Sequence, residues 1–392
     1  MTGSELAWTT PVPLTADERS LRDLVREFAA GEVAPHAARW WHEERCPTEL
    51  FQRMGKLDLM GLLAPEDHGG TNVSTTALVA AVFEIAKIDQ SIAAAWQCHL
   101  TIGSIPLIKF GTEAQKERWL RPLAMGERLG SFALTEPGAG SDASGIRSMA
   151  QRSDDGWTLD GTKVFISNAG TETSLGPVVL ARTTSSGGTD ADSFVSLLVP
   201  SSTPGFSFGP KLRGIGWHSL DSRQLTFEGV QLTDAHVIGE PGRGLAQFLD
   251  TLDVGRITIA TLGIALAEAV LELSLDYATH RQQFGRPISK FQGIQFKLAD
   301  IASQLEAVKL LVYRSAQLRD QGLPFAMESA MAKLLASELA MKAASEAVQI
   351  HGGYGFMHEY PVARFFCDAK VLEIGEGTSE IQRIVIARHL GC

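Results

Sequence analysis

The chain has 392 residues, of which 44% are hydrophobic and 20% charged, and it carries a net charge of −10 at neutral pH. Its length predicts roughly two to three domains, and its ordinary globular composition excludes a disordered chain. The acidic balance excludes the basic footprint of a nucleic-acid or anionic-membrane binder at the level of the whole chain.

The first third of the chain is expected to be helical. Thr15 and Glu18 form a capping-box pattern, and apolar residues follow them at helical spacing. The stretch 75–110 is rich in Ala, Ile and Leu and is interrupted only at Gly103 and Pro106. Buried helices fit such a stretch better than strands.

Short apolar runs alternate with turn signals from about Gly130 to about Gly239. The pair Asp160-Gly161 predicts a turn within one such run. A loop of Thr, Ser, Gly and Asp at 183–192 separates two others. We expect an antiparallel β-domain of about a hundred residues here.

The remainder of the chain returns to helical patterns, at 244–282, at 291–320, and again up to about 350. The glycine-rich stretch HGGYG follows, and a last helix ends the chain. The expected fold class is therefore α+β, with a helical domain at 1–128, a middle β-domain at 129–241 and a C-terminal helical bundle at 242–392.

Neither of the common nucleotide-binding motifs is present. No strand is followed by GxGxxG and a helix, and no GxxxxGK[ST] sequence occurs. A Rossmann nucleotide site therefore has little support.

The four cysteines, Cys46, Cys98, Cys367 and Cys392, form no CxxC pair and no zinc-ligand spacing. This argues against a disulfide framework and against a metal site, and for a reducing compartment. No Lys or Arg precedes Arg19, so a signal or transit peptide is not indicated, and a cytoplasmic location is expected. No uninterrupted apolar run approaches membrane length, so no membrane insertion is expected.

Two segments contain residues suited to ligand binding or proton transfer. The segment 132–142, FALTEPGAGSD, has glycines that permit close approach of a flat or phosphorylated ligand, although such loops are also common turns. Glu376 lies between Gly375 and Gly377, which leaves a single carboxylate with a clear path to a substrate proton. An acidic residue in a turn before a helix is the alternative interpretation.

Two further segments are suited to phosphate binding. Arg281 and Arg286 stand near a helix end and could hold a pyrophosphate, or could simply favour the helix C-terminus. In the segment 349–353 the glycines are either a helix C-cap or a place of close backbone approach to a polyphosphate.

Taken together, these segments identify a protein family much more specifically than any one of them does alone. LTEPGAGSD, VFISNAG, RQQFGRPISKFQ, QIHGGYGF and EGTSEIQR occur in this order, and together they resemble the acyl-CoA dehydrogenase family over most of the chain. The resemblance implies a helical N-terminal domain, a middle β-domain and a C-terminal four-helix bundle. It also implies noncovalently bound FAD, a homo-oligomer that is a tetramer built from dimers, and an electron-transferring flavoprotein as electron acceptor.

Residue roles follow from the same resemblance. Residues expected to bind FAD are Phe132, Leu134, Thr135, Gly140, Ser141, Phe165, Ile166, Ser167, Arg281, Gln283, Phe284, Gln292, Gln349, Gly352, Gly353, Thr378 and Glu380. Those from Arg281 to Gly353 would hold the cofactor of a neighbouring subunit. Residues expected to bind substrate are Ser141, Asp253, Arg256, Gly375 and Gly377. Many family members have Trp at the position of Phe165 and Gln at that of Glu380.

Glu376 matches the catalytic base of the family. In a subset of members the base instead precedes the arginine of the LDVGR segment, where this chain has Gly255. The expected reaction is α,β-dehydrogenation of an acyl thioester, with Glu376 removing the α-proton and flavin N5 accepting the β-hydride. The backbone N–H of Glu376 and a ribose hydroxyl of FAD would stabilise the charge on the thioester oxygen.

Three alternatives remain open. The same fold could support a related flavin oxidase or hydroxylase, or act on an acyl or aminoacyl group bound to a carrier protein. A non-enzymatic interaction protein descended from the family is the third, and intact flavin segments with a retained Glu376 argue against it.

The acyl group is expected to be short to medium in length, and it could be branched. Several straight-chain enzymes of the family carry Tyr where this chain has Gly375, so the pocket beside the α- and β-carbons should be wider. The far end of the pocket falls near Trp96, Gln97 and Cys98. Trp96 either shortens the pocket or packs in the helical core.

Overall fold

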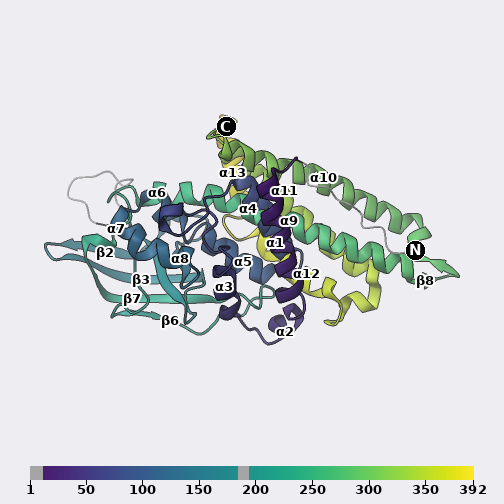
Figure 1. Ribbon diagram of the computed structural model, residues 1–392, viewed down its shortest axis with the longest axis horizontal. Coiled ribbons are helices and arrows are strands. Elements are labelled where there is room, and N and C mark those ends of the chain that lie inside the picture. The colour runs from purple at the N-terminus through teal and green to yellow at the C-terminus, as the bar shows by residue number, and fades with distance from the viewer. Residues whose placement is uncertain (1–11, 184–193) are drawn as a thin grey trace.

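The computed structural model describes residues 12–183 and 194–392. It shows two helical regions with a β-sheet region attached to one end, as expected (Figure 1). Except for its first residue, the predicted loop at 183–192 lies outside the described residues.

The N-terminal region is built of helices, and the predicted capping box is confirmed: Thr15 and Glu18 each bind the other's backbone N–H. A break between helices occurs at Gly103 as predicted, whereas Pro106 lies in the first turn of the next helix, where proline is tolerated. The helices are α1 (Ala16–Phe28), α2 (Ala37–His42), α3 (Thr48–Gly55), α4 (Thr75–Ala86), α5 (Gln90–Leu100), α6 (Ile105–Phe110), α7 (Glu113–Gln115) and α8 (Arg121–Ala124).

The middle region forms a seven-stranded sheet that is mixed rather than wholly antiparallel. Strand β1 pairs with β4 in parallel, and so does β2, while the other pairs are antiparallel. Each parallel pair requires that the chain, after leaving the first strand, crosses back over the sheet before it begins the second. The residues that connect the strands make these crossings. The strands are β1 (Leu129–Ala133), β2 (Met149–Ser153), β3 (Gly156–Ser167), β4 (Ser174–Thr183), β5 (Phe194–Leu198), β6 (Phe206–Phe208) and β7 (Ser222–Leu232).

The turn predicted at Asp160-Gly161 is wrong, since both residues lie inside the continuous strand β3. The register with β7 shifts between Leu159 and Gly161, which is the signature of a β-bulge. Gly161 has φ +150°, and a Cβ there would lie 2.3 Å from the Ser148 hydroxyl. The glycine therefore serves close packing against the adjoining chain, a use that a turn signal cannot distinguish.

The C-terminal region contains the long helices that the sequence predicts, together with one short helix, α12, that it did not. A small hairpin, β8 (Gln282–Gln283) with β9 (Arg286–Pro287), follows the first helix. The helices are α9 (Gly244–His280), α10 (Gln292–Asp320), α11 (Ala326–His351), α12 (Pro361–Ala369) and α13 (Ser379–His389).

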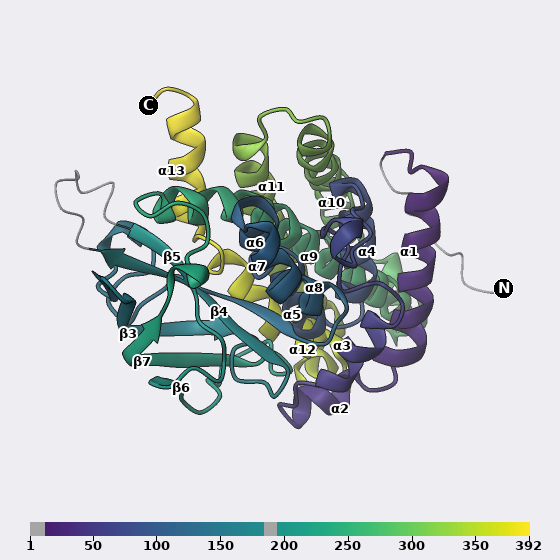
Figure 2. The ribbon, with the colours of Figure 1, turned by 60° about the vertical axis from the view of Figure 1, so that its left-hand side comes forward.

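Two helical stretches, Gln90–Phe110 and Gly244–His280, are long and apolar enough to span a membrane by length and composition alone. In each, 89% of the apolar window is buried inside the protein. Their apolar character is explained by their position, because α5 and α9 lie at the centre of the molecule where several helices and the sheet meet (Figure 2).

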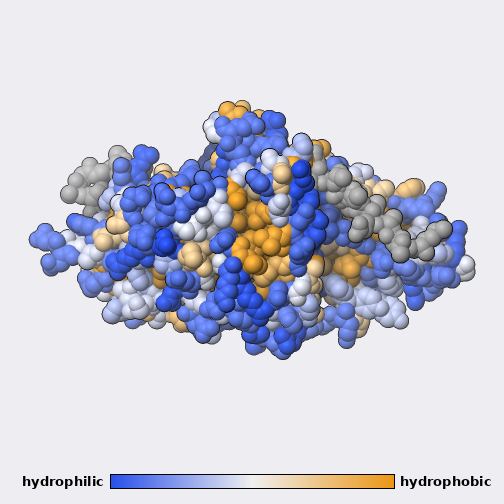
Figure 3. Space-filling model, viewed as in Figure 1, coloured by the Kyte–Doolittle hydropathy of each residue, from blue (hydrophilic) through white to orange (hydrophobic). Residues whose placement is uncertain are grey.

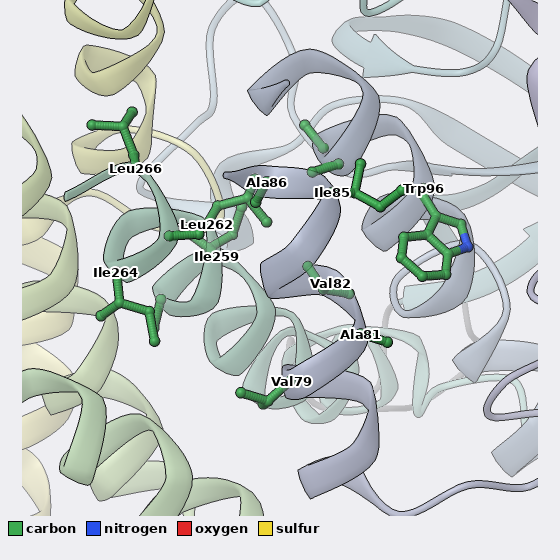
Figure 4. Packing of buried hydrophobic residues seen from close by; sticks show 14 of the residues in the cluster. Val79, Ala81, Val82, Ile85, Ala86, Trp96, Ile259, Leu262, Ile264 and Leu266 are labelled. Carbon is green, nitrogen blue, oxygen red and sulfur yellow. The ribbon is translucent and has the colours of Figure 1, made fainter. Parts of the chain in front are cut away.

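One large core joins the N-terminal and C-terminal helices. Val79, Val82 and Ile85 of α4 pack toward Ile259 and Leu262 of α9 (Figure 4). The surface around this core is mostly hydrophilic, with one apolar area near the middle of the face shown in Figure 3.

Trp96 belongs to the same core. Its side chain is fully buried, and its indole N–H donates to the Leu59 carbonyl at 2.9 Å (Figure 4). Of the two interpretations left open by the sequence, the structure supports packing in the helical core.

Candidate functional site

Glu376 lies in the short connection between α12 and α13, in a backbone conformation that few residues adopt. Its φ is +53°, and that of Gly377 is +96°. The Lys333 ammonium of α11 and the Gln382 amide of α13 both donate to the Gly377 carbonyl, at 2.7 and 2.8 Å. Both of these side chains are fully buried, so the loop is held from two helices.

The carboxylate of Glu376 has one bound and one free oxygen. Oε1 accepts a hydrogen bond from the Gln97 amide at 3.2 Å. Oε2 is buried and has no hydrogen-bond partner among the described residues. Burial raises the pKa of Glu376 to about 7, against the opposing effects of the Gln97 hydrogen bond and the positive charges of Lys333 and Arg256. A carboxylate with a pKa near neutrality is suited to accept a proton.

Helix α9 passes directly beside this carboxylate at Gly255. A Cβ atom built on Gly255 would lie 1.9 Å from Oε2 of Glu376. No other residue type fits here while Glu376 keeps its position. The Glu376 carboxylate therefore occupies the space next to Gly255, where a subset of the family that the chain resembles carries its base.

Asp253 and Arg256 lie on the same helix and form an ion pair one turn apart. Arg256 is buried, and its Nε has no partner among the described residues. Burial raises the pKa of Asp253, while the Arg256 charge opposes that shift. Arg256 lies within electrostatic range of Glu376, and Asp253 is connected to it only through its ion pair with Arg256.

A second group of predicted residues lies where β1 and β3 end, next to α5. The Val164 N–H donates to the Thr135 carbonyl at 2.9 Å, which holds the two segments together. Phe165 has φ +61° and a side chain that is 69% exposed. An aromatic residue held in the left-handed region and presented outward is a feature of binding sites rather than of cores.

Two buried side chains connect this group to α5. The Gly130 N–H donates to Nδ1 of His99, so the opposite ring nitrogen donates to the Met60 carbonyl, at 3.0 Å in both cases. The Asn168 amide donates to the Ala95 carbonyl at 2.9 Å. Ser167 makes a hydrogen-bond contact with Cys98, which itself lies within electrostatic range of Glu376. These contacts attach β1 and the end of β3 to α5, the helix that also carries Gln97.

The loop between β1 and β2 depends on one buried ion pair. The Lys163 ammonium donates to Glu136 at 2.9 Å and to the Leu134 carbonyl at 2.9 Å. The Glu136 carboxylate also accepts from the backbone N–H groups of Arg147 and Ser148, at 2.6 and 2.9 Å. Thr135, Gly140 and Ser141 are thus presented by a loop whose two ends are fixed.

A third group lies elsewhere, near hairpin β8–β9, which Figure 1 places at the opposite end of the molecule from the sheet. Arg281, Gln283, Gly352 and Gly353 line a cavity of about 470 Å³ there. Phe284 is at the tip of the hairpin with φ +52° and is 92% exposed. Gln292 and Gln349 are exposed nearby, at the start of α10 and near the end of α11.

Gly352 ends α11 with φ +61°, so the helix C-cap interpretation is correct. A Cβ on Gly352 or Gly353 would meet nothing within 4 Å, so there is also space for a ligand to approach the backbone closely. The predicted cofactor residues therefore fall into two separate places within a single chain.

The sequence interpretation missed several residues that shape the site. Lys333, Thr258 and Lys163 are polar residues inside otherwise buried elements, and Gln97 was considered only as a residue at the far end of the pocket. A buried polar group must have a partner, and this was the available signal. No cluster of three or more His, Cys, Asp or Glu suited to a metal occurs within 12–183 and 194–392.

The residues that the structure does present fit a flavin nucleotide. In the loop after β1, Gly138 has open space around it, and a Cβ on Gly140 would meet only the Thr135 methyl group at 4.0 Å. An exposed aromatic face, bare backbone and hydroxyl groups suit a flat ring. Arg281 beside bare glycines suits phosphates.

Comparison with known proteins identifies the family. Three family models match in order: the acyl-CoA dehydrogenase N-terminal domain at 15–127, the middle domain at 131–230 and the C-terminal domain at 242–391. The chain belongs to the acyl-CoA dehydrogenase family. A probable acyl-CoA dehydrogenase of Bacillus subtilis is 43% identical over 96% of this chain and 98% of its own length. A short-chain specific acyl-CoA dehydrogenase of Megasphaera elsdenii is 39% identical over 95% and 97%.

Solved structures of the acyl-CoA dehydrogenase family have the same fold. Butyryl-CoA dehydrogenase from Megasphaera elsdenii superposes with a TM-score of 0.93, at 38% identity, covering 97% of this chain and 100% of that one. An acyl-CoA dehydrogenase from Bacillus anthracis, complexed with FAD, gives 0.91 at 29% identity, covering 97% and 68%. The prolyl acyl carrier protein oxidase AnaB gives 0.91 at 28%, covering 97% and 100%.

These likenesses confirm the expected fold and the expected class of enzyme, an oxidoreductase that carries out acyl-CoA dehydrogenase-type dehydrogenation. The expected cofactor is confirmed at the level of the family, because acyl-CoA dehydrogenases are FAD-dependent flavoproteins.

Proposed function

We propose that this enzyme dehydrogenates short- to medium-chain acyl-CoA thioesters, straight or branched, with Glu376 as the base that removes the α-proton. The observation that carries the proposal is the state of the Glu376 carboxylate: one oxygen is held by Gln97, the other is buried without a partner among the described residues, and burial raises the pKa to about 7. A base with this proton affinity is well matched to removing a proton from a weakly acidic carbon at neutral pH.

The proton and electrons balance as follows. The α-carbon loses a proton to Oε2 of Glu376, the β-carbon loses a hydride, and a carbon–carbon double bond forms between them. FAD supplies the hydride acceptor when it is bound. The backbone N–H of Glu376, in the left-handed conformation fixed by Lys333 and Gln382, is a donor for the thioester oxygen on which charge develops.

The cofactor would be held by two chains. In the proposal, the ends of β1 and β3 with Thr378 and Glu380 hold the flavin portion in one subunit, and the hairpin group with Arg281 holds the nucleotide portion of another subunit's FAD. The separation of the two groups, one beside α5 near the centre of the molecule and one at the hairpin end, supports this arrangement (Figure 1). An exposed Phe284 at a hairpin tip supports it too, since a bare aromatic ring is costly in water.

A homotetramer built from dimers is the assembly that we propose on this basis. An electron-transferring flavoprotein remains the proposed acceptor of the electrons, and a cytoplasmic location agrees with four cysteines that are all free.

The acyl-chain preference has two supports. One is that a relative of nearly the same length, 39% identical to this chain, is specific for short chains. The other is the space next to the base: a Cβ placed on Gly375 would have only the Val371 carbonyl within 4 Å, at 3.5 Å, so the side of the pocket is free of a side chain there. Trp96 gives no support, because it is part of the core.

A carrier-protein thioester is the second candidate substrate, favoured by the structural likeness to AnaB. Anaerobic mixing of the FAD-loaded protein with a panel of acyl-CoA and acyl-carrier-protein thioesters distinguishes the two. Loss of flavin absorbance with butyryl-CoA or isobutyryl-CoA is expected. Bleaching only by carrier-bound thioesters, or only by palmitoyl-CoA, would overturn the proposed substrate.

A further inference from the structure

Gln97 is a fully buried glutamine on the apolar helix α5, and its side chain reaches the catalytic loop. Its amide nitrogen lies 3.2 Å from Oε1 of Glu376 and 3.1 Å from the Cys98 thiol. A buried primary amide is costly unless its donors and acceptors are used. Here one of its contacts is the carboxylate that the proposed function makes the base.

The orientation of the amide is set by two threonines. The Thr258 hydroxyl of α9 lies 2.6 Å from Oε1 of Gln97, and the Thr101 hydroxyl lies 3.2 Å from the same oxygen. The ionised Glu376 carboxylate can only accept, so the NH₂ group of the amide faces it and the carbonyl oxygen faces the two hydroxyls, which are able to donate. Were the amide reversed, its oxygen would face a carboxylate oxygen, and the two would repel.

Thr258 is well placed for this task because its own position is fixed. It lies on α9 one turn beyond Gly255, whose carbonyl is 2.9 Å from the Thr258 hydroxyl. The helix that makes room for the Glu376 carboxylate at Gly255 thus also orients the amide that binds it. Two adjoining turns of α9 act on the same carboxylate, one by leaving space and one through Gln97.

The consequence for Glu376 is an asymmetry between its two oxygens. Oε1 is used by Gln97, and Oε2 is buried without a partner in the described part of the chain. A neutral amide that donates to the charged form of a carboxylate favours that form and fixes the plane of the group. The unbound oxygen is the one left to accept a proton.

We propose that Gln97, oriented by Thr258, is a positioning residue that binds Oε1 of Glu376 and reserves Oε2 as the atom that receives the substrate proton. The proposal rests on the proposed function, since it assigns a task to Gln97 only if Glu376 is the base. It goes further than that function by naming the proton-accepting atom and the residues that select it.

Other groups also face the carboxylate and contribute to its proton affinity. Lys333 approaches from α11, Arg256 from α9, and the Cys98 thiol from α5. Replacing Thr258 leaves all three in place, whereas replacing Gln97 also removes the contact of its amide with the Cys98 thiol, so the Thr258 variant separates the two effects. Any shift in the pH profile between such variants is therefore assigned to the Gln97–Thr258 pair.

The test measures the pH profile of flavin reduction by butyryl-CoA in anaerobic stopped flow, with the FAD-loaded enzyme. In Gln97→Leu the carboxylate loses a hydrogen bond that favours its charged form, so the pKa of Glu376 rises and the acid limb moves to higher pH. Loss of a hydrogen bond to a charged group predicts a rate lower by roughly ten- to a hundredfold and a limb shifted by about one to two pH units.

Thr258→Val should shift the limb in the same direction by a smaller amount, and Thr258→Ser should restore it, because serine keeps the hydroxyl. Thr258→Val also carries the test if Gln97→Leu does not fold. The matched control is Gln90→Leu, which removes a buried amide from the same helix. Gln90 donates to the carbonyls of Ala86 and Leu262, so its loss should lower thermal stability and leave the pH profile in place.

An unchanged limb and rate in both Gln97→Leu and Thr258→Val would overturn the proposal while Glu376→Gln stays inactive. A limb that moves equally in Gln90→Leu would also overturn it, because the shift would then reflect general loosening of α5. If Glu376→Gln itself reduces flavin at the wild-type rate, the proposed function fails and the Gln97 proposal fails with it.

Discussion

The carboxylate of Glu376 lies against the bare Cα of Gly255, such that a Cβ on Gly255 would come within 1.9 Å of Oε2. Gly255 stands inside a long helix, where glycine is destabilising by roughly 1 kcal/mol relative to alanine. This glycine is thus explained by the space that the Glu376 carboxylate needs and not by the backbone of α9.

Gly255→Ala should fold normally and lose activity. The atom that must move is the end of a flexible side chain, so the helix need not shift, but the base is displaced. A misplacement of about 1 Å costs roughly a hundredfold in rate. The measurement is kcat with butyryl-CoA alongside FAD content.

Gly263→Ala on the same helix is the matched control. Its Cβ would meet the Ala336 backbone carbonyl of α11 at 2.8 Å, far from a flexible chain end. It should lower the melting temperature with little change in kcat per bound FAD. Equal activity loss in both variants would show that Gly255→Ala acts through helix packing instead.

Glu376→Gln should stabilise the protein, and more so at alkaline pH. The folded-state pKa of about 7 lies above the ordinary value of 4.5, so the folded state binds the proton more tightly. Stability from this group is fully present below about pH 4.5 and is lost as pH rises through 7, by up to about 3 kcal/mol at 1.36 kcal/mol per pKa unit. Melting temperatures of both proteins at pH 5 and pH 8 measure the difference.

An exposed carboxylate provides the comparison for that experiment. Glu127→Gln on the surface should leave the difference between pH 5 and pH 8 as in wild type. A gain in stability for Glu376→Gln that is the same at the two pH values would contradict a raised pKa at this position.

Lys163→Met should unfold the middle region more easily. It leaves the buried Glu136 carboxylate without its cation, and breaking one side of a buried pair costs about 3–5 kcal/mol. FAD retention should fall as well, because Glu136 fixes the loop that carries Thr135 and Ser141. The double variant with Glu136→Gln should recover part of the stability, as denaturant unfolding can show. No recovery in the double variant would argue against the ion pair as the cause.

Arg281→Ala should weaken FAD retention through the partner subunit. Loss of a charge-assisted phosphate contact costs roughly 1.5–3 kcal/mol. Equilibrium dialysis of FAD, with size-exclusion chromatography for the assembly, measures it. Arg314→Ala, an exposed arginine of α10 in a weak surface pair with Glu328, is the control. A monomer that keeps full FAD occupancy would contradict the shared site.

Gly375→Tyr should narrow the pocket beside the reacting carbons. Overpacking costs about 1–3 kcal/mol, and a branched chain should meet the new ring before a straight chain does. Turnover of isobutyryl-CoA should therefore fall more than that of butyryl-CoA. Equal losses for the two thioesters would contradict this view of the pocket.

Much of the fold could be predicted from residue patterns. Periodicity and caps indicated the helix order, and the Thr15–Glu18 capping box is present as predicted. The parallel pairing of β1 with β4 could not be predicted, because a strand's own pattern does not name its partner. The turn prediction at Asp160-Gly161 failed for a related reason, since the sequence alone does not distinguish a glycine in a β-bulge from a glycine in a turn.

The candidate site was predicted only in part. Glu376 and the two glycine-rich segments could be assigned through long, ordered motifs, and their roles remain proposals. The roles proposed for Gln97 and Thr258 could not be predicted from the sequence, because they depend on the contact between α5 and α9. The domain boundaries at 128 and 241 also remain predictions, with β1 beginning at Leu129 and α9 at Gly244.

The most direct test of Glu376 as the base is anaerobic stopped-flow reduction of bound FAD by butyryl-CoA in wild type and Glu376→Gln. Glutamine keeps the shape of the side chain and removes the base, so reduction should slow by about two to four orders of magnitude. FAD content and binding of the substrate should be preserved. Reduction of Glu376→Gln at a rate near that of wild type would contradict the claim that Glu376 removes the α-proton.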